Sequence, residues 1–234
     1  MPDYDLYYWP VPFRGEFVRA VLAFAGMRWR EHDAAAISKW MSGPPKRMPV
    51  PFMGPPVLVD VRAKVAISQT TAIVIYLGET LRLLPADAAE RALALKTVAD
   101  ANDVIDEVTL DGGRQMWTAK SWRAFEPRLE KWMSLWEESG RRHGLKRDSG
   151  FLLGGDAPGI ADVVTAILWG TPAARFPRIA EMLEKAAPRT AALGRRIGAL
   201  PALAKLAAKS RRAYGEAYCG GQIEASLRKA LGGA

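Results

Sequence analysis

The residues of this chain best suited to chemistry lie in one aromatic stretch, LYYWPVPFRGEFVRAVLAFAG, which runs from Leu6 to Gly26. An apolar run ends there at a turn broken by prolines, and a helical pattern begins directly after it. Two adjacent phenols, Tyr7 and Tyr8, stand at the mouth of this turn. Because side chains alternate across a strand, only one of the two can face a cleft. A phenol in that position either packs in the core or is held at the edge of a cleft.

The single cysteine and the two histidines offer fewer possibilities. Cys219 on its own cannot form an internal disulfide framework, which fits a reducing cytoplasm. Only His32 and His143 are available to join it in a thiolate–imidazole pair or a metal site. We therefore expect no metal and no catalysis based on cysteine.

The formal net charge of +8 raises the question of a nucleic-acid partner. The basic residues are spread along the chain, and their densest clusters fall near expected helix ends, where cations complement the helix dipole. No helix-turn-helix, zinc-finger or RNA-binding signature accompanies them. We expect no nucleic-acid partner, although a positive field favours an anionic small molecule.

The sequence also gives no sign of a membrane or secreted protein. No apolar run reaches the roughly 20 residues that span a bilayer. The first residues, MPDYDLYYW, include acidic side chains and lack the basic segment of a secretory signal. We expect a cytoplasmic protein of two small domains or one larger one, since the chain has 234 residues.

The elements that would position the two phenols alternate between strand and helix in the first third of the chain. The segment from Met41 to Pro56 is rich in proline and is expected to be a loop. Around it, the patterns predict strands over Tyr4–Trp9 and Trp29–Asp33, a hairpin over Val57–Ile67, and helices over Arg14–Met27 and Thr71–Leu83.

After Pro85 the strand patterns stop and long helical patterns follow. They cover Ala88–Met116, Ser121–His143, Gly159–Leu168, Pro177–Ala186, Thr190–Ile197 and Pro201–Tyr214. The chain is therefore divided into an α/β domain over 1–84, an all-helical domain over 88–214 and a tail over 215–234. Within the tail, residues 223–231 have the pattern of a short amphipathic helix.

This order of elements resembles the glutathione S-transferase family, and the resemblance extends from about Tyr4 to Tyr214. It implies a thioredoxin-like α/β N-terminal domain in the order βαβαββα, followed by an all-α C-terminal domain. It also implies glutathione as co-substrate, a small hydrophobic electrophile as second substrate, and a homodimer.

Tyr8 is the position that looks catalytic by this resemblance. In the tyrosine-type classes the first strand ends in a tyrosine and an aromatic residue, and an Arg-Gly pair opens the first helix. Here Tyr8-Trp9 is followed by Arg14-Gly15, with Pro12 and Phe13 as two extra residues before the arginine. A phenol that donates its O–H to sulfur stabilises the thiolate, and lowering a thiol pKa by about two units requires about 2.7 kcal/mol.

The segments GPPVLVD and SQTTAIVIYLGE match the family's glutathione-binding edge. Pro56 stands where the family has a cis-proline, and the residue before it pairs with the cysteine part of glutathione through its backbone. Here that residue is Pro55, which has no N–H and so removes one expected hydrogen bond. Gln69 and Thr70 stand at the family's Gln-Ser positions, where a helix N-terminus holds the γ-glutamyl carboxylate.

Weaker matches complete the expected glutathione site. Trp40 and Lys46 have the separation of a pi-class pair that contacts the glycyl carboxylate, and Lys46 is equally consistent with a solvated loop lysine. Arg14 either lines the cleft or caps its helix. Asp103 stands where the pi class has an aspartate that reaches across a dimer, and it is equally consistent with a solvated acidic face.

A further segment, FLLGGDAPGIADVV, matches a helix-capping motif of the family. The usual Ser or Thr is Gly159 here, and Asp162 is still able to accept a hydrogen bond from the Gly159 N–H. We assign this motif to stability.

The sequence thus favours a glutathione transferase that acts in detoxification, with its electrophile bound between Tyr8, the Pro10–Phe13 turn and the region of Asp106–Gln115. Trp117 either lines that pocket or is buried in the core. The alternative is a non-catalytic relative that carries ligands or serves in assembly, and Pro55 favours it. A binder of nucleic acid or acidic surfaces rests on charge alone.

Overall fold

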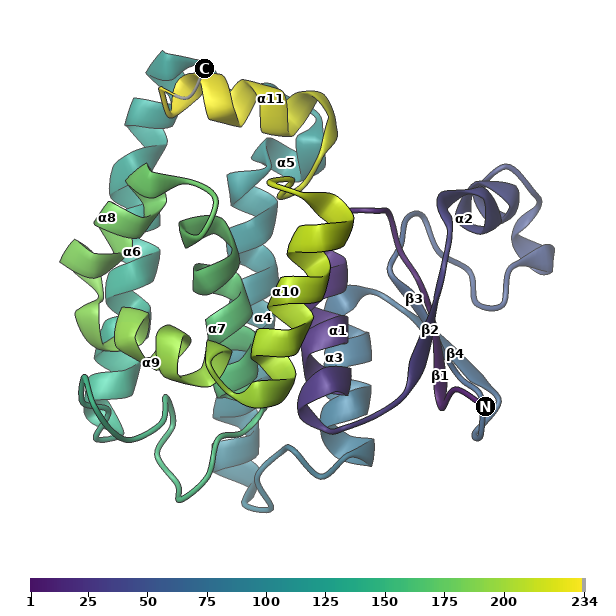
Figure 1. Cartoon of the computed structure of the whole chain (residues 1–234), viewed down its shortest axis with the longest axis horizontal. Coiled ribbons are helices and arrows are strands. Elements are labelled where there is room, and N and C mark those ends of the chain that lie inside the picture. The colour runs from purple at the N-terminus through teal and green to yellow at the C-terminus, as the bar shows by residue number, and fades with distance from the viewer. Residues whose placement is uncertain (233–234) are drawn as a thin grey trace.

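The computed structural model describes residues 1–232 and shows a small sheet unit beside a larger helical part (Figure 1). The sheet has the strand order β2-β1-β3-β4, where β1 is Tyr4–Tyr7, β2 is Trp29–His32, β3 is Val57–Asp60 and β4 is Val65–Ser68. Strand β1 pairs in parallel with β2 and antiparallel with β3, and β3 pairs antiparallel with β4. The predicted thioredoxin-like α/β domain requires a mixed sheet with helices on both faces, and the chain forms such a sheet.

Helices α1 (Phe13–Phe24) and α3 (Thr70–Thr80) cover the sheet face that looks toward the helical part. Helix α2 (Ala34–Met41) and the 3-10 turn η1 (Pro45–Arg47) lie on the opposite side. Helix α1 buries Phe17, Val18, Val21 and Leu22, whose spacing places them on one side of the helix. This arrangement puts the start of α1 directly after the end of β1, at the junction between the sheet unit and the helical part.

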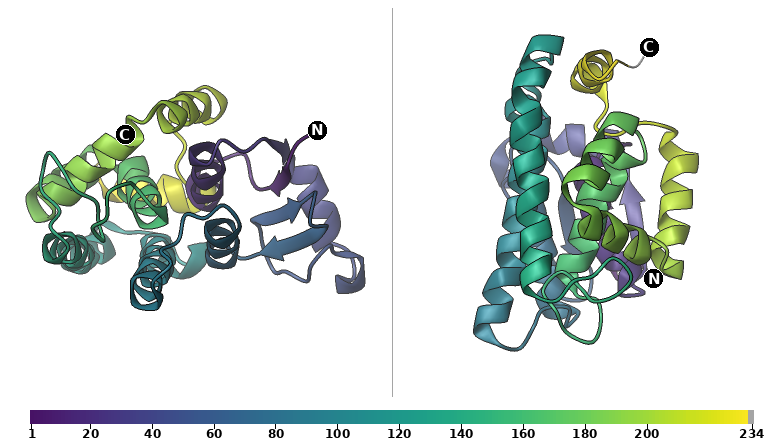
Figure 2. Two further views of the ribbon diagram at one scale, coloured as in Figure 1. Left: turned by 90° about the horizontal axis from the view of Figure 1, so that it is seen from below. Right: turned by 90° about the vertical axis from the view of Figure 1, so that its left-hand side faces the viewer.

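The helical part consists of two long helices and a set of shorter ones. The long helices, α4 (Ala88–Val108) and α6 (Ala119–Arg142), run alongside one another, with the short α5 (Leu110–Gly113) between them in the sequence (Figure 2). The remaining helices are α7 (Ile160–Ala173), α8 (Pro177–Ala186), α9 (Pro188–Gly198), α10 (Pro201–Tyr214) and α11 (Gly221–Ala230).

Helix α7 forms the centre of the core because it is apolar on nearly all sides. Its start is capped by Asp162, whose carboxylate accepts the Gly159 N–H at 2.9 Å and the Leu152 N–H at 2.8 Å. The same end of α7 packs on α3, since a Cβ added to Gly78 would lie 2.7 Å from Cδ1 of Ile160. The capping motif therefore joins the two parts of the molecule.

Several element boundaries differ from the sequence prediction. The first strand ends at Tyr7 rather than Trp9, since the chain turns at Pro10. The helix predicted over Ala88–Met116 ends at Val108, because Leu110, Gly112 and Gly113 all adopt positive φ values that interrupt an α-helix. The proline-rich segment holds the turn η1 as well as loop.

The tail forms helix α11, which crosses the end of the helical part near α5 (Figure 1). The Trp117 backbone N–H donates to Oγ of Ser226 at 3.0 Å, which fixes this crossing. None of the helices in the described part of the chain combines the length and apolar character that crossing a bilayer requires.

Candidate active site

Tyr8 lies just past the end of β1, with its ring on the side of α1. Its side chain is 4% exposed, and its hydroxyl accepts the backbone N–H of Arg14 at 3.1 Å. Arg14 stands in the first turn of α1, where backbone N–H groups have no partner within the helix. The phenol oxygen therefore caps the positive end of α1, and its own proton stays free to be donated to an acceptor.

Gly15 makes this position of the phenol possible. A Cβ added to Gly15 would lie 2.3 Å from Cδ1 and 2.7 Å from Cγ of Tyr8, closer than atoms in real structures approach. The ring therefore packs directly on the backbone of the first helical turn. The Arg14-Gly15 pair noted in the sequence thus has a steric role in addition to the charge of its arginine.

Tyr7 points to the other face of the sheet, as strand alternation predicts. Its ring stacks on His32, with centroids 4.0 Å apart, and meets Trp40 of α2 at 4.4 Å. Of the two adjacent phenols, only Tyr8 therefore lies at the start of α1.

Burial raises the pKa of Tyr8 to about 12, against a smaller opposing effect of Arg14. The buried ring disfavours the phenolate because a charge is poorly solvated there. The hydroxyl is therefore protonated throughout the neutral range. A protonated phenol at a helix N-terminus is a hydrogen-bond donor suited to stabilising an anion.

The Arg14 side chain reaches from α1 to the long helix α4. It donates from Nη1 to Oδ1 of Asn102 at 2.6 Å and from Nη2 to Oδ1 of Asp106 at 3.2 Å. These contacts fix the first turn of α1 against the helical part. From the sequence, Arg14 was expected either to line the cleft or to cap its helix. Its partners Asn102 and Asp106 were not predicted, although their spacing of four residues places them on one face of a helix.

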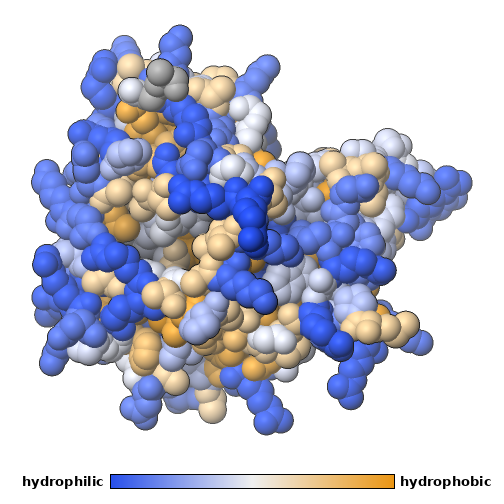
Figure 3. All heavy atoms as spheres, viewed as in Figure 1, coloured by the Kyte–Doolittle hydropathy of each residue, from blue (hydrophilic) through white to orange (hydrophobic). Residues whose placement is uncertain are grey.

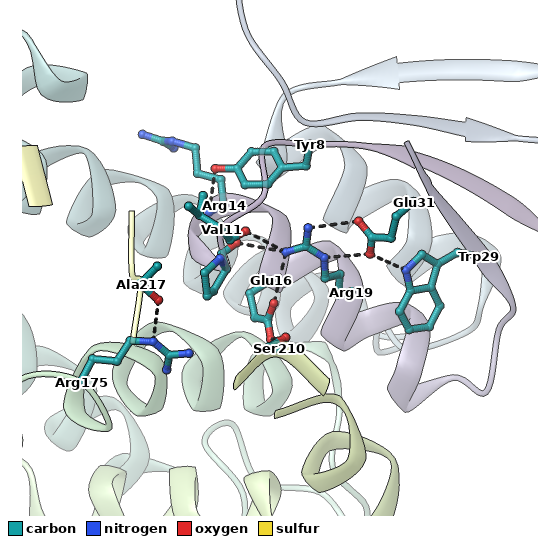
Figure 4. Close-up of polar contacts among 11 residues, drawn as sticks. Tyr8, Val11, Arg14, Glu16, Arg19, Trp29, Glu31, Arg175, Ser210 and Ala217 are labelled. Atoms are coloured by element: carbon teal, nitrogen blue, oxygen red, sulfur yellow. Dashed lines mark hydrogen bonds and ion pairs between the residues drawn. The ribbon is translucent and has the colours of Figure 1, made fainter. Parts of the chain in front are cut away.

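A second arginine, Arg19, holds the turn that follows Tyr8 (Figure 4). It is 2% exposed, and its Nη1 donates to the carbonyls of Val11 at 3.0 Å and Pro12 at 3.3 Å. Its Nε and Nη2 form a two-point ion pair with Glu31 of β2. Arg19 was not expected from the sequence to be functional. The apolar residues directly before and after it, Phe17-Val18 and Ala20–Leu22, were the signal that could have found it.

Glu16 extends this network into the helical part. Its Oε2 lies 3.3 Å from Nη1 of Arg19, and its Oε1 accepts the hydroxyl proton of Ser210 from α10 at 2.6 Å. Both carboxylate oxygens of this buried glutamate therefore have partners (Figure 4). The network links the turn, the sheet and α10.

The tail packs against the same turn. The Phe13 N–H donates to the carbonyl of Tyr218 at 3.2 Å, and the two rings meet edge to face with centroids 5.3 Å apart. Glu224 of α11 accepts the N–H groups of Tyr218, Cys219 and Gly220 at 2.9, 3.0 and 2.6 Å. The tail thus forms part of the wall around the start of α1, a role that sequence reasoning missed.

Cys219 lies in this tail segment, and burial raises the pKa of its thiol to about 12. The thiol is therefore protonated at neutral pH and is a poor nucleophile. The described residues hold no group of three or more His, Cys, Asp and Glu side chains arranged to bind a metal ion.

The edge of the sheet that was predicted to hold glutathione contains two unusual backbone features. The Pro55–Pro56 peptide bond is cis, and Pro56 is buried at the start of β3. Gln69 is exposed and has φ 73 and ψ 123, a conformation that non-glycine residues rarely adopt. Thr70, the first residue of α3, is buried and follows this strained position directly.

The weaker candidates lie on the surface or outside this junction. Trp40 packs in the aromatic cluster with Tyr7, and Lys46 is exposed in η1. Asp103 is exposed on α4 and makes no hydrogen bond or ion pair within the described residues, although its neighbour Asn102 binds Arg14. Trp117 is a core residue, since it is buried and its indole N–H donates to the Val108 carbonyl at 2.8 Å.

Comparison of the sequence with known proteins shows which family it matches. The family model described as "Glutathione S-transferase, C-terminal domain" matches residues 93–230. A curated relative, glutathione S-transferase P of Bos taurus, is 33% identical over 108 residues, which are 46% of this chain. The match spans 48% of the length of that relative.

Solved structures share the fold. Monomeric Na-GST-3, a glutathione S-transferase of Necator americanus, has a TM-score of 0.70 at 22% identity, covering 88% of this chain and 96% of its own. Ure2p in complex with glutathione has a TM-score of 0.70 at 16% identity, covering 87% of this chain and 92% of its own. At these identities the likeness is one of fold.

Proposed function

The chain belongs to the glutathione S-transferase family, and from that premise we propose that it is a glutathione transferase in which Tyr8 activates the thiol of glutathione. The observation that carries this proposal is the capping contact of Tyr8. The hydroxyl oxygen of Tyr8 accepts the Arg14 N–H, so the hydroxyl proton remains available to be donated to another acceptor. A sulfur placed beyond that proton would receive a hydrogen bond from a phenol polarised by a helix N-terminus.

The chemistry follows from the pKa values of the two groups. A free thiol has a pKa of about 8.5, so only a small part of it is thiolate at neutral pH. A hydrogen bond donated to sulfur favours the anion over the thiol. The thiolate then attacks the electrophilic carbon of a small hydrophobic substrate, forms the C–S bond and displaces the leaving group or adds to a double bond.

The other groups proposed to hold glutathione lie along the sheet edge. The start of α3, with Gln69 and the buried Thr70, is suited to the γ-glutamyl carboxylate. The carbonyl of Pro55 remains available to accept the N–H of the cysteine part. Trp40 and Lys46 are assigned to the glycyl carboxylate at the far end.

The positive charge of Arg14 is proposed to stabilise the glutathione thiolate, while Asn102 and Asp106 hold the guanidinium in place. Asp103, exposed beside them, is assigned to the amine of the γ-glutamyl group in a dimer. We propose a homodimer on this ground, and the mass of the protein in solution tests it. A monomeric relative with the same fold makes the monomer a real alternative outcome.

The experiment is conjugation of glutathione to an activated aryl halide, compared among wild type, Tyr8→Phe and Tyr7→Phe. The two substitutions remove the same atom from adjacent residues on opposite faces of the sheet. We expect kcat/KM to fall by about 100-fold in Tyr8→Phe, as for the loss of one donor to a developing anion. Tyr7→Phe is expected to keep the wild-type rate, and equal loss in both variants would refute the role of Tyr8.

The alternative is a non-catalytic relative that binds ligands, and Pro55 is the specific observation in its favour. The missing N–H removes a hydrogen bond to glutathione worth about 0.5–1.5 kcal/mol. Calorimetric titration separates the two proposals. Binding of glutathione without turnover of any electrophile supports the non-catalytic protein, whereas binding with turnover supports the enzyme.

A place in the cytoplasm and a role in detoxification belong to the same proposal. Reduced glutathione is the thiol buffer of that compartment, so the co-substrate is available there. A broad range of accepted electrophiles would support detoxification, and strict selectivity for one substrate would count against it.

A further inference from the structure

Tyr7, the phenol that faces away from Tyr8, belongs to a cluster of aromatic rings on the outer face of the sheet. The ring of His32 stacks on Tyr7 with centroids 4.0 Å apart and planes 10° apart. Trp40 of α2 meets the same ring at 4.4 Å, and Phe52 meets Trp40 edge to face at 6.2 Å. The contacts therefore follow the order His32, Tyr7, Trp40 and Phe52, and Tyr7 is the ring that joins the sheet to α2.

The His32 end of this cluster is fixed by charged groups of the sheet. Nε2 of His32 lies 3.1 Å from Oδ1 of Asp5. The same carboxylate accepts Nε and Nη2 of Arg30 at 2.8 and 3.1 Å. Asp5 and Tyr7 are two residues apart in β1, so their side chains lie on the same face of the sheet. His32 is thus held in the position from which it stacks on Tyr7.

Helix α2 depends on Trp40 for its attachment to the sheet. Of the eight residues of α2, only Ile37 is buried. A helix of this length is not stable in isolation, so it needs packing contacts to persist. Trp40 lies three residues after Ile37, on the same side of the helix, and packs on Tyr7. The ring of Tyr7 therefore determines where Trp40, and with it the end of α2, is held.

The segment that contains α2 is suited to an anionic ligand. Residues 34–56 include no Asp or Glu, whereas Lys39, Lys46 and Arg47 are basic. None of these three cations forms an ion pair with a carboxylate in the part of the chain that the structure describes. Hydrophilic side chains dominate the surface at the end of the molecule where α2 lies (Figure 3). A carboxylate at this end would meet a positive field.

Trp40 itself offers a hydrogen-bond donor to such a carboxylate. Its side chain is partly exposed, and its indole N–H makes no hydrogen bond within residues 1–232. An indole N–H only donates, so a carboxylate oxygen is a suitable partner. The apolar body of the indole packs on Tyr7 while its polar tip remains available to a ligand.

From the ring contacts, the weak attachment of α2 and the uncompensated positive charge, we propose that the ring of Tyr7 positions Trp40 for the glycyl carboxylate of glutathione, and so makes the protein select thiols that carry this carboxylate. The inference rests on the proposed transferase function. Tyr8 acts on the thiol from one face of the sheet, and Tyr7 acts through Trp40 on the far end of the same molecule. Tyr7 is a positioning residue whose ring, and not its hydroxyl, is required.

The test is a calorimetric titration with glutathione and with γ-glutamylcysteine, which is the same thiol without the glycine. We expect wild type to bind glutathione about tenfold more tightly than γ-glutamylcysteine. Tyr7→Leu should raise the Kd for glutathione about tenfold, because the indole loses its aromatic support, and should leave the Kd for γ-glutamylcysteine unchanged. Tyr7→Phe keeps the ring and should bind both thiols as wild type does.

Steady-state kinetics separate positioning from general damage to the fold. In Tyr7→Leu the KM for glutathione should rise about tenfold, while kcat at saturating glutathione stays at the wild-type value because Tyr8 is untouched. If Tyr7→Leu does not fold, His32→Ala removes the ring behind Tyr7 from the edge strand β2 and should raise the same KM about threefold. His143→Ala is the matched control, since the other histidine of the chain lies at the end of α6.

Three results would overturn this inference while leaving the transferase function intact. They are unchanged glutathione binding in Tyr7→Leu, equal affinity of wild type for the two thiols, and an equal loss of affinity for both thiols in Tyr7→Leu. The last would mean that the substitution disturbs the whole site. Failure of wild type to bind either thiol would instead refute the transferase function, and this inference with it.

Discussion

At the scale of single residues, the function proposed for this protein depends on one phenol and the backbone beneath it. Tyr8 is buried, and its oxygen is engaged by the Arg14 N–H. Its neighbour in the sequence, Tyr7, is identical in chemistry and lies on the other face of the sheet. The strand and the helix start, rather than the type of side chain, therefore decide which tyrosine is placed to act.

The pKa of Tyr8 predicts how the rate depends on pH. Burial raises this pKa to about 12, so the folded protein keeps the phenol protonated at every pH used for assays. The value of kcat/KM should rise with pH as the thiol of glutathione ionises and then stay level up to about pH 10. A fall in rate between pH 8 and pH 10 that Tyr8→Phe abolishes would contradict this, because it would mean that the phenol ionises early.

Gly15→Ala tests the contact between the phenol and the helix. The added Cβ would lie 2.3 Å from Cδ1 of Tyr8, so the ring has to move. We expect kcat/KM to fall by about 100-fold, comparable to the loss of the hydroxyl, because small displacements of a catalytic group are costly. Gly194→Ala is the control, since its Cβ would have an ordinary contact of 3.9 Å. A Gly15→Ala rate close to wild type would show that the ring contact is not needed.

At the scale of elements, the turn between β1 and α1 is the part that the rest of the fold supports. Arg19 binds two carbonyls of the turn, and through Glu31 it fastens them to β2. Glu16 and Ser210 continue the contact to α10. Arg19 is the cation that Glu16 and Glu31 share, so removing it leaves both carboxylates without a cation.

Arg19→Met should therefore destabilise the protein strongly. The substitution leaves Glu16 buried without its cation, and we expect a loss of about 3–5 kcal/mol in the free energy of unfolding, measured with urea. Arg141→Ala removes an exposed arginine paired with Glu138, and we expect it to change the free energy of unfolding far less, because solvent screens an exposed ion pair. Equal losses in the two variants would show that the network contributes little.

The sequence allowed most of these elements to be predicted, because they follow local patterns. Alternation separated Tyr7 from Tyr8, and helical spacing located α1 and the long helices. The predicted glutathione S-transferase family and fold class are confirmed. The cis bond at Pro56 was also expected and is present.

The contacts that could not be predicted from the sequence join residues far apart in the chain. The partners of Arg14 on α4 are 88 and 92 residues away from it, and Ser210 is 194 residues from Glu16. No local pattern carries such pairings. A cavity of about 490 Å³ among α7, α8, α9 and α10 was missed for the same reason, since small residues such as Gly170 and Gly194 leave a space only when the helices face each other.

At the scale of the whole molecule, the tail ties the helical part to the sheet unit. Helix α11 and the segment before it reach back to the turn after β1, where the Tyr218 carbonyl accepts the Phe13 N–H. The family resemblance in the sequence ended at Tyr214, yet the residues after it form part of the wall around the start of α1.

Glu224→Ala tests this coupling over distance. The substitution leaves three tail N–H groups without their acceptor, and we expect a loss of about 3 kcal/mol in stability. Hydrogen exchange at the Phe13 amide should accelerate together with exchange in the tail, because that amide donates to Tyr218. Faster exchange in the tail with unchanged exchange at Phe13 would show that the tail moves independently of the turn.

The measurement to make first is the pKa of the glutathione thiol when bound to this protein, taken from the ultraviolet absorbance of the thiolate as pH is raised. Wild type and Tyr8→Phe are compared at saturating glutathione. We predict a pKa about two units below the free value of about 8.5 in wild type, and a return close to that value in Tyr8→Phe. The same thiol pKa in both proteins would contradict the role proposed for Tyr8.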